Sequence, residues 1–395
     1  MQDRDVVVVS GARTPIGTFG GAFRDVPARE LAATAIRAAI ARAGLQPQDV
    51  DEVIVGCVSQ IGEDAYIART SALGAGLPIE STAYSVNRQC GSGLQAIVSA
   101  AETISAGHAE VVAAGGTEQM SGIPFLDRRS RWGQRLGHFE MEDGLALALN
   151  CPFNACHMGV TAENVAEQFG VPRDEQDAFA LESQRRAAAA IAEGRFREQI
   201  VPVAVPQRRG EPTLVETDEH PRPDSTAEGL AGLRPFFKKD GTVTAGNASG
   251  INDGAAAIVV TSGRVARERG LKPLLRLRAA AAAGVDPSIM GVGPIPAVRK
   301  VLKRAGMQVD DLDLIELNEA FAAQAIAIIR DLGLDPARVN PNGGAIALGH
   351  PVGATGSILA VKSLYELQRT DQETALITMC IGGGQGIAAV FERLN

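Results

Sequence analysis

Aromatic side chains are scarce in this sequence. Phe, Trp and Tyr together make up 4% of the 395 residues, whereas glycine alone contributes 44 residues. Small side chains and tight backbone turns must therefore supply much of the packing. The length exceeds that of a single ordinary core, so we expect two or more packed units.

Long apolar runs are missing too. The N-terminal stretch MQDRDVVVVSGARTP contains a run of only four valines. A signal peptide needs a longer apolar region and a membrane span needs about 18 apolar residues, so we interpret this run as a first strand. Nothing later in the chain approaches that length. We therefore expect no membrane partner and a cytoplasmic location.

An excess of basic residues is also lacking. The formal net charge is −8, which argues against nucleic acid as a partner because nucleic-acid-binding surfaces carry clustered Lys and Arg. An anionic small molecule remains compatible with this charge if a few cations gather locally. The sequence thus favours a protein that acts on small molecules.

Cysteines are few and irregularly spaced. There are five, an odd number, and no export signal accompanies them, so we predict free thiols rather than a disulfide framework. They are Cys57, Cys90, Cys151, Cys156 and Cys380.

One of these thiols stands in an unusual setting. Residues 86–97 read VNRQCGSGLQAI, which places Cys90 directly before Gly-Ser-Gly and a predicted helix. The unsatisfied N–H groups of a helix start favour a thiolate, which is the reactive form of cysteine. A small apolar residue at a tight strand-to-helix turn would give the same pattern, so this stretch alone leaves both interpretations open.

The chain contains a hidden repeat. Residues 42–53 read RAGLQPQDVDEV, and residues 304–315 read RAGMQVDDLDLI. In both, an amphipathic helical pattern ends at a glycine and passes through an acidic turn into an apolar run. At nearly the same offset, Cys90-Gly-Ser-Gly matches His350-Pro-Val-Gly, and residues 111–118 match 377–384 as a strand that runs into glycines.

These matches predict a duplicated β/α unit. We place one copy at about residues 1–120 and the other at 265–395, each forming a mostly parallel sheet with helices around it. The intervening residues 121–250 are rich in Arg and Pro and contain one clear helical pattern at 173–194. We interpret them as an inserted loop domain that covers the site and makes subunit contacts.

Several reactive residues occupy similar positions relative to the predicted strands of the two copies. Cys90, Asn318, His350 and Cys380 all lie near the ends of predicted strands. Open α/β sheets bind ligands at the carboxyl ends of their strands. We therefore expect these four side chains to converge on one site.

Six motifs carry a resemblance to a known family. They read NRQCGSGLQA, HMGVTAENVA, GTVTAGNASGINDGAAA, NEAFA, GGAIALGHPVGATG and CIGGGQG, in chain order. With VVSGARTPIG at the start, the chain resembles a thiolase over essentially its whole length, most closely the short-chain biosynthetic type. The resemblance implies an α/β fold of two βαβαβ halves in a five-layered α-β-α-β-α core. We divide the chain into an N-terminal half (1–120), a loop domain (121–250) and a C-terminal half (251–395).

The resemblance also implies an activity, which is reversible Claisen condensation and thiolysis between acetyl-CoA and a short acyl-CoA. Such a reaction needs a nucleophile, a base for an α-proton and donors for two oxyanions. By resemblance, Cys90 carries the acyl group and Cys380 handles the proton. His350 activates Cys90 and bonds a thioester oxygen together with a water held by Asn318, and the N–H groups of Cys90 and Gly382 form a second oxyanion hole.

Structural interpretations stand beside these roles. Cys380 also fits a buried strand cysteine, His350 a residue that caps a turn, and Asn318 a turn residue after a strand. The place of His350 opposite Cys90 in the repeat favours the functional interpretation for that pair.

Substrate contacts follow from the same resemblance. His157 and Met158 would contact the pantetheine arm and acyl group, Ser249 the pantetheine amide, and Arg222 the nucleotide end of CoA. The family often has serine near Gly229, and glycine cannot make that side-chain bond, which puts the nucleotide contacts in doubt. Cys151 and Cys156 lie close to His157, but no second ligand pair accompanies them, so we expect no metal.

Rival functions differ in their reactive residues. Decarboxylating ketoacyl synthases generally use a cysteine with two histidines or with histidine and asparagine, and hydroxymethylglutaryl-CoA synthase relies on a glutamate base. A thiolase-like lipid carrier would have no need of Cys90, His350 and Cys380.

We expect an acyltransferase with no resident cofactor, because CoA esters are its substrates. We also expect a homotetramer, with a dimer as the alternative. Acyl length stays open, because methionines near the pocket, such as Met158 and Met290, do not define a cavity size from the sequence alone.

Overall fold

The computed structural model describes residues 2–394 of an α/β protein. Its largest feature is a ten-stranded hydrogen-bonded array in the order β14-β15-β16-β13-β1-β12-β5-β3-β4, with the short β2 (Gly17–Thr18) attached to β12. The other nine strands are β1 (Val6–Arg13), β3 (Glu52–Gly56), β4 (Thr82–Val86), β5 (Val111–Gln119), β12 (Asn252–Ser262), β13 (Leu275–Gly284), β14 (Leu314–Leu317), β15 (Thr374–Ile381) and β16 (Gln385–Arg393).

The array folds into two stacked sheets that meet at one short seam. Only Val7 with Arg276 and Val8 with Leu275 pair across β1 and β13. Between the sheets lie α3 (Ser92–Ser105) and α12 (Thr355–Thr370), which contact each other and strands of both halves. α12 is covered on nearly all sides, and its buried residues include Lys362, which pairs with the buried Glu316 at 2.7 Å.

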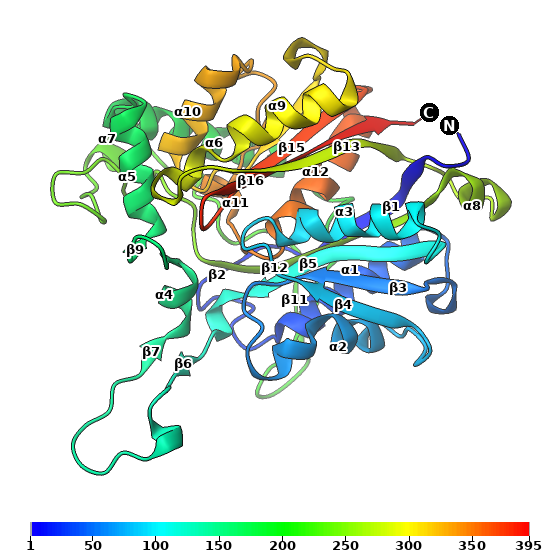
Figure 1. Ribbon diagram of the computed structural model, residues 1–395, viewed down its shortest axis with the longest axis horizontal. Helices are drawn as coiled ribbons and strands as arrows, with labels where there is room; N and C mark the ends of the chain where they lie inside the picture. Colours follow the sequence, from blue (N-terminus) through cyan, green and yellow to red (C-terminus); the bar gives the residue numbers. More distant parts are fainter. Residues whose placement is uncertain (1, 395) are drawn as a thin grey trace.

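Further helices cover the two outer faces. α1 (Ala28–Arg42) and α2 (Ile67–Gly74) pack on the first sheet, while α9 (Pro294–Ala305) and α10 (Ala322–Leu332) pack on the second. Figure 1 shows the resulting order of layers, with α9 at the top and α2 at the bottom. The five-layered α-β-α-β-α core expected from the sequence is therefore confirmed.

The predicted repeat is visible in local geometry. In one half, η1 (Pro47–Asp49) connects α1 to β3, and in the other η6 (Val309–Asp311) connects α9 to β14. Both turns carry the same reciprocal cap, in which the N–H of Gln46 or Gln308 donates over 2.7 Å to the aspartate three residues on. The helices α3 and α12 that follow occupy equivalent central positions.

The structure corrects two expectations about the sheets. β3 pairs in parallel with β4 and β5, as β14 does with β15, but β12, β13 and β16 pair antiparallel to their neighbours. The prediction of mostly parallel sheets was wrong because Gly382–Gly384 make a tight hairpin that joins β15 to β16 antiparallel. In addition, β12 lies between β1 and β5, so it completes the first sheet although the sequence-based division places it in the C-terminal half.

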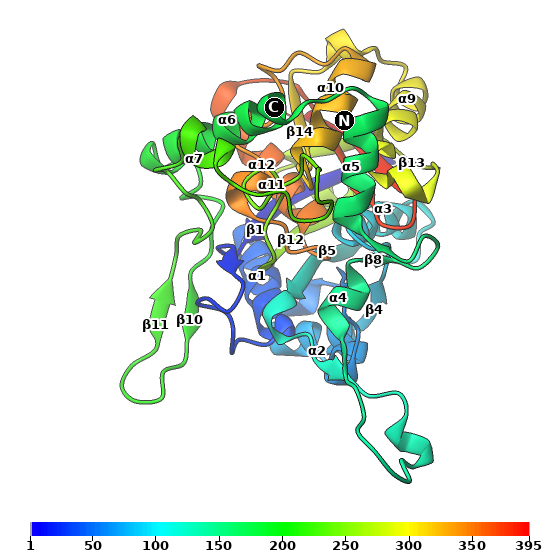
Figure 2. The ribbon, with the colours of Figure 1, turned by 90° about the vertical axis from the view of Figure 1, so that its left-hand side faces the viewer.

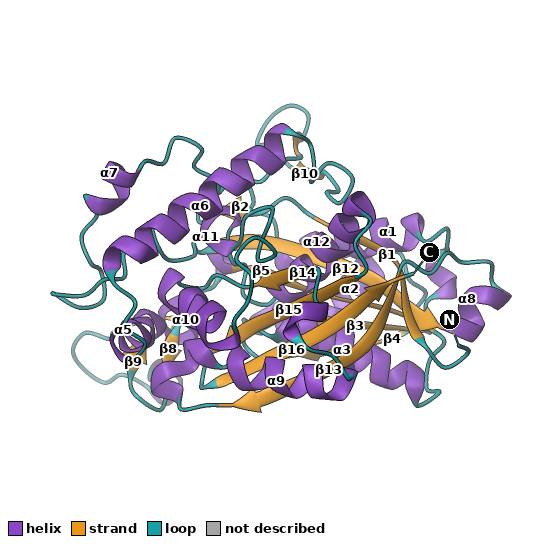
Figure 3. Ribbon diagram, turned by 90° about the horizontal axis from the view of Figure 1, so that it is seen from above, coloured by secondary structure: helices purple, strands orange, loops and turns teal. Residues whose placement is uncertain are grey.

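The segment between the halves is mostly loops and short elements. The predicted helix at 173–194 is present as α6 (Arg173–Ala192). Figure 3 shows α5, α7 and most of α6 at the end of the strands opposite the two termini. Two hairpin arms, β6–β7 and β10–β11, project from the body in Figure 2. This segment contains η3 (Met120–Gly122), β6 (Phe125–Leu126), η4 (Ser130–Trp132), β7 (Glu142–Asp143), α4 (Gly144–Ala148), β8 (Asn150–Cys151), β9 (Cys156–His157), α5 (Met158–Gln168), α6, β10 (Val203–Val205), β11 (Thr213–Val215) and α7 (Ala227–Ala231).

The remaining short elements are η2 (Gly62–Tyr66), α8 (Gly263–Glu268), η5 (Pro287–Val292) and α11 (Ala345–Leu348). Among the described helices, none combines the length and the apolar character that crossing a bilayer requires.

Candidate active site

Cys90 lies in the turn between β4 and the start of α3. The preceding residue, Gln89, has a left-handed backbone with φ of 46°. The Ser92 hydroxyl donates to the carbonyl of Gln89 over 2.6 Å and accepts from the N–H of Arg88 over 2.9 Å. These bonds hold the turn in a shape that presents Cys90 ahead of the helix.

The glycines around Cys90 allow a close approach between the two halves. A Cβ atom on Gly91 would lie 2.7 Å from the Ile381 side chain, and one on Gly93 would lie 2.9 Å from the carbonyl oxygen of Gly353. Ile381 follows Cys380, and Gly353 follows His350 by three residues. The Gly-Ser-Gly pattern therefore brings three catalytic segments together.

The electrostatic setting of Cys90 differs from the expectation. Burial raises the pKa of the Cys90 thiol to about 11, although the backbone N–H groups of Gly382 and of Cys90 itself act to lower it. The prediction that the helix start favours a thiolate was wrong for the resting enzyme, because desolvation penalises the charged form more than the backbone donors stabilise it. Cys90 therefore needs a base when it reacts.

His350 occupies the turn between α11 and α12. Its N–H donates over 2.9 Å to Asn252, whose side chain in turn donates over 2.9 Å to the carbonyl of Gly17. The ring is buried, and burial lowers the pKa of His350 to about 4. The imidazole is thus neutral at physiological pH and can accept a proton.

The tautomer of His350 follows from its neighbour Thr355. Nδ1 lies 2.6 Å from the Thr355 hydroxyl, and that hydroxyl donates to the carbonyl of Pro351 over 3.0 Å. The hydroxyl oxygen is therefore the acceptor for Nδ1–H, which leaves the lone pair on Nε2. Nε2 lies 3.4 Å from Nδ2 of Asn318.

Asn318 follows the end of β14 and is fully buried. Its N–H donates to the carbonyl of Thr378 on the neighbouring strand over 3.0 Å. Its Oδ1 has no hydrogen-bond partner within residues 2–394. Asn318 thus contacts the imidazole at Nε2 and is not among the residues that line the cavity described below.

Cys380 lies near the end of β15 and is fully buried. Its thiol donates over 3.8 Å to Oε1 of Gln324, and that oxygen also accepts from the N–H of Ala320 over 3.1 Å. Burial, together with the nearby Cys90 thiol, raises the pKa of Cys380 far above its ordinary value. In the resting enzyme Cys380 is therefore a thiol whose proton points to Gln324.

One cavity of about 260 Å³ brings most of the predicted residues together. Its walls are otherwise apolar, with Met120, Ile251 and Phe321 among them. The predicted residues that line it are Cys90, His157, Met158, Ser249, His350, Cys380 and Gly382, together with Met290. A cavity with two thiols, two imidazoles and backbone donors suits acyl transfer.

His157 and Met158 lie at the start of α5. Nδ1 of His157 accepts from the N–H of Gly159 over 3.0 Å, and its ring stacks on Phe237 at 4.7 Å between centroids. Met158 approaches Gly382, where a Cβ atom would lie 3.1 Å from its methyl group. The glycine at 382 therefore leaves room at the reacting end of the cavity.

Arg222 is outside this cavity. It lines a second one of about 220 Å³, together with His220, Thr226 and Gly229, and both cavities share Ala245 in their walls. The N–H of Arg222 donates to Gln184 over 2.9 Å, while its side chain is exposed. The two cavities are therefore neighbours, one beside an exposed cation and the other at the buried thiols.

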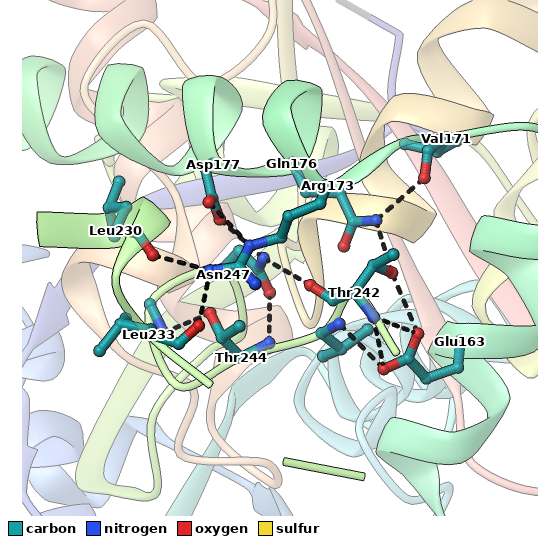
Figure 4. Close-up of polar contacts among 12 residues, drawn as sticks. Glu163, Val171, Arg173, Gln176, Asp177, Leu230, Leu233, Thr242, Thr244 and Asn247 are labelled. Carbon is teal, nitrogen blue, oxygen red and sulfur yellow. Dashed lines mark hydrogen bonds and ion pairs between the residues drawn. The ribbon is translucent and has the colours of Figure 1, made fainter. Parts of the chain in front are cut away.

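The loop that carries Ser249 is held by polar contacts shown in Figure 4. Glu163 on α5 accepts hydrogen bonds from the N–H groups of Thr242 and Val243 at 2.8 and 2.9 Å. At the far end of the loop, the N–H of Ser249 donates to the carbonyl of Ala320 over 2.9 Å. Glu163 therefore fixes the loop from one side and the segment before α10 fixes it from the other.

A second part of this network reaches the neighbouring cavity. Asn247 donates over 2.9 Å to Asp177, which also accepts from Arg173 over 2.7 Å (Figure 4). Arg173 donates in addition to the carbonyl of Leu230, a residue in the wall of the second cavity. One polar network thus positions both cavities relative to each other.

Sequence analysis missed Glu118, a buried carboxylate beside the site. Each of three backbone N–H groups, those of Val58, Ser59 and Gly353, donates to it over 2.9 Å. It therefore ties the His350 turn to the segment after β3, and burial raises its pKa. The one sign of Glu118 in the sequence was an acidic residue near the end of the predicted strand VVAAGGTEQ. Gln324 and Thr355 were missed as well, since nothing local marks them.

Cys151, Cys156 and His157 raised the question of a metal site in the sequence. Within residues 2–394, no three His, Cys, Asp or Glu side chains are grouped so that they could hold a metal ion.

Comparisons with known proteins agree with this site. Residues 6–264 match the thiolase N-terminal domain and residues 271–393 match the thiolase C-terminal domain. The chain is 56% identical to the beta-ketothiolase BktB of Cupriavidus necator, over 99% of this chain and all of that one. It is 51% identical to an acetyl-CoA acetyltransferase of Pseudomonas aeruginosa, over 99% of this chain and all of that one.

Solved structures show the same likeness. The Bacillus anthracis acetyl-CoA acetyltransferase superposes with a TM-score of 0.97 at 49% identity, covering 99% of both chains. Human mitochondrial 3-ketoacyl-CoA thiolase in complex with CoA gives a TM-score of 0.95 at 44% identity, covering 99% of this chain and 98% of that one. On its sequence, its fold and these matches, the chain belongs to the thiolase family.

Proposed function

We propose that this thiolase-family acyltransferase catalyses reversible Claisen condensation and thiolysis between acetyl-CoA and a short acyl-CoA, through an acyl-enzyme on Cys90. The observation that carries the proposal is the single cavity lined by Cys90, His350, Cys380 and Gly382. A nucleophile, a base and an oxyanion donor are what acyl transfer requires, and a second thiol provides the further proton carrier that condensation needs.

In the first half-reaction, Nε2 of His350 takes the proton of Cys90 and the thiolate attacks the thioester carbon. The N–H groups of Cys90 and Gly382 would stabilise the oxyanion, because both already lower the pKa of the Cys90 thiol. The departing CoA thiolate takes its proton from Cys380. The acyl-enzyme then stands beside an imidazolium and a Cys380 thiolate.

In the second half-reaction, the Cys380 thiolate removes an α-proton from a second CoA ester. The resulting enolate oxygen accepts a hydrogen bond from Nε2–H of His350, whose ring stays anchored through Nδ1–H, 2.6 Å from the Thr355 hydroxyl. The enolate carbon attacks the acyl group on Cys90 and expels the Cys90 thiolate, which regains its proton from His350. Thiolysis runs through the same steps in reverse.

The scheme uses only side chains and CoA esters, so we propose that no resident cofactor takes part. His157, Met158 and Ser249 would contact the pantetheine arm and the acyl group, because they line the walls that lead to the thiols. Arg222, in the second cavity, would bind the phosphates of CoA. Reduced thiols at the site fit a cytoplasmic location.

The direct test is thiolysis of acetoacetyl-CoA with added CoA. We expect two molecules of acetyl-CoA for each acetoacetyl-CoA consumed, with no requirement for a malonyl ester and no release of CO₂. A decarboxylating condensing enzyme would need the malonyl ester, and a carrier protein would bind the ester without consuming it. Either of those results would contradict the proposed function.

We further propose a homotetramer assembled through the β6–β7 arm. This arm projects from the body (Figure 2) and exposes several apolar side chains, including Trp132 at 86% and Leu136 at 94%. Such side chains on a projecting arm suit burial against another copy. Light scattering of the variant with Trp132→Ser and Leu136→Ser should show dimers where the unaltered chain shows tetramers, and unchanged tetramers would contradict this role of the arm.

A further inference from the structure

Two cysteines outside the reactive centre face each other in the hairpin formed by β8 and β9. Cys151 and Cys156 are directly opposite in the antiparallel register, and both are reduced. Residues opposite each other in antiparallel strands have Cα atoms about 4.5–5.5 Å apart and side chains on the same face. A disulfide spans Cα separations of about 4.4–6.8 Å. The backbone therefore already holds this pair at bonding range.

This hairpin forms part of the rim of the reactive cavity. Leu149 before it and His157 within it both line the cavity, and the carbonyl of Leu149 accepts from the N–H of Met158 over 2.9 Å. At its tip, the ring of Phe153 lies 3.6 Å from the position that a Cβ of Gly383 would occupy. A covalent link across the hairpin would thus fix a wall of the cavity next to the loop after Cys380.

We propose that Cys151 and Cys156 are a modification site, at which a low-molecular-weight disulfide converts the two thiols into a reversible intrachain disulfide. Cys156 is half-buried and Cys151 is fully buried, so Cys156 meets the reagent first. Its thiolate attacks the reagent, forms a mixed disulfide and releases one thiol. The Cys151 thiolate then attacks the Cys156 sulfur and releases the second thiol, so that two protein thiols and one disulfide yield one protein disulfide and two thiols.

The surroundings of Cys156 determine how the rate of the exchange depends on pH. Burial and the neighbouring Cys151 raise the pKa of Cys156, while the charge of Lys238 opposes them. The thiolate is the attacking species, so the exchange should become faster as pH rises above neutrality.

The test is mass spectrometry of the full-length enzyme after incubation with oxidised glutathione, acid quenching, denaturation and alkylation. Trypsin cleaves after Arg135 and Arg173, so both cysteines fall in one peptide, residues 136–173. We expect most molecules of this peptide to be two hydrogens lighter and to carry no alkyl group. After reduction with dithiothreitol, both cysteines should again be available and become alkylated. Enzyme activity is not the readout, because any oxidation of Cys90, which lines the reactive cavity, would also abolish it.

The chain offers an internal control and a matched variant. Cys57 is buried beside Glu118 and Ser59, and it is the one cysteine in the tryptic peptide 43–69, which should remain fully alkylated. In Cys156→Ser, a change at a half-buried position, Cys151 should likewise stay alkylated. The proposal is overturned if the unaltered peptide carries two alkyl groups, if a glutathione adduct persists on Cys156, or if the disulfide links two chains.

Discussion

Nδ2 of Asn318 lies 3.4 Å from Nε2 of His350, although one residue follows a strand and the other sits in a turn between two helices. The opposite ring nitrogen of His350 is held at 2.6 Å by Thr355. The imidazole is therefore fixed at both nitrogens, with its lone pair on the one that faces Asn318. Base catalysis by His350 depends on this arrangement.

Thr355→Val tests the hold on the imidazole. Valine keeps the shape but removes the hydroxyl, so Nδ1–H loses its acceptor and the tautomer is no longer fixed. We expect kcat for acetoacetyl-CoA thiolysis and the rate of Cys90 acetylation to fall about ten- to a hundredfold, which corresponds to about 1–3 kcal/mol, with KM nearly unchanged. Ser357→Ala is the matched control, since that hydroxyl donates to Ala354 on the same helix. Equal losses in both variants would contradict the role of Thr355.

Burial of neutral His350 predicts a dependence of stability on pH. Its pKa is about 4 in the folded protein and about 6.5 in an unfolded chain. Between these values the unfolded chain binds a proton that the folded chain does not, so the free energy of unfolding falls as pH decreases from 6.5 toward 4. Above pH 7 this contribution is constant.

Urea unfolding of the unaltered protein and of His350→Asn measures this effect. Between pH 7 and pH 5 the unaltered protein should lose about 2 kcal/mol more than the variant, because a shift of one pKa unit is worth about 1.4 kcal/mol. Other titrating groups, His220 among them, are common to both proteins and cancel in the difference. Parallel curves over the whole range would show that the pKa of His350 is the same in the folded and unfolded states, which would contradict its burial as a neutral imidazole.

Arg222→Ala tests the placement of the nucleotide end of CoA. Arg222 lines the second cavity, remote from the thiols, so its loss should weaken ground state and transition state alike. We expect KM for CoA esters to rise about tenfold and kcat to stay near that of the unaltered enzyme. Arg209→Ala, at an exposed site between β10 and β11, should change neither constant. A fall in kcat at constant KM would place Arg222 at the reacting end instead.

The layered fold and the reactive residues could be predicted from the sequence for a physical reason. Glycines that permit close approach surround Cys90 and Cys380, and the repeat aligns His350 with Cys90 by residue spacing alone. Local signals could not predict Thr355, Gln324 or Glu118, because their partners come from distant segments or from the shape of a turn.

Two other features escaped prediction for related reasons. The position of β12 between β1 and β5 depends on pairing across more than a hundred residues. The raised pKa of Cys90 depends on burial, and the side chains packed around it, such as Val58, Met120 and Val352, come from distant parts of the chain. This burial outweighs the effect of the helix start that the sequence made visible. Both are properties of the assembled fold, whereas glycine patterns and repeats are properties of short segments.

The central claim is that Cys90 carries the acyl group while Cys380 moves the α-proton, and Cys380→Ser separates the two tasks. Serine is nearly isosteric with cysteine but a far weaker acid, so the fold should survive while the proton carrier is lost. The measurement is paired in one preparation: acetylation of the peptide containing Cys90 after brief exposure to acetyl-CoA, and the rate of acetoacetyl-CoA synthesis. We predict retained acetylation of Cys90 and condensation reduced by about 10²–10⁴-fold, the usual contribution of general acid–base catalysis. Equal loss of both activities would contradict the claim and assign the α-proton to another base, with His350 first in line.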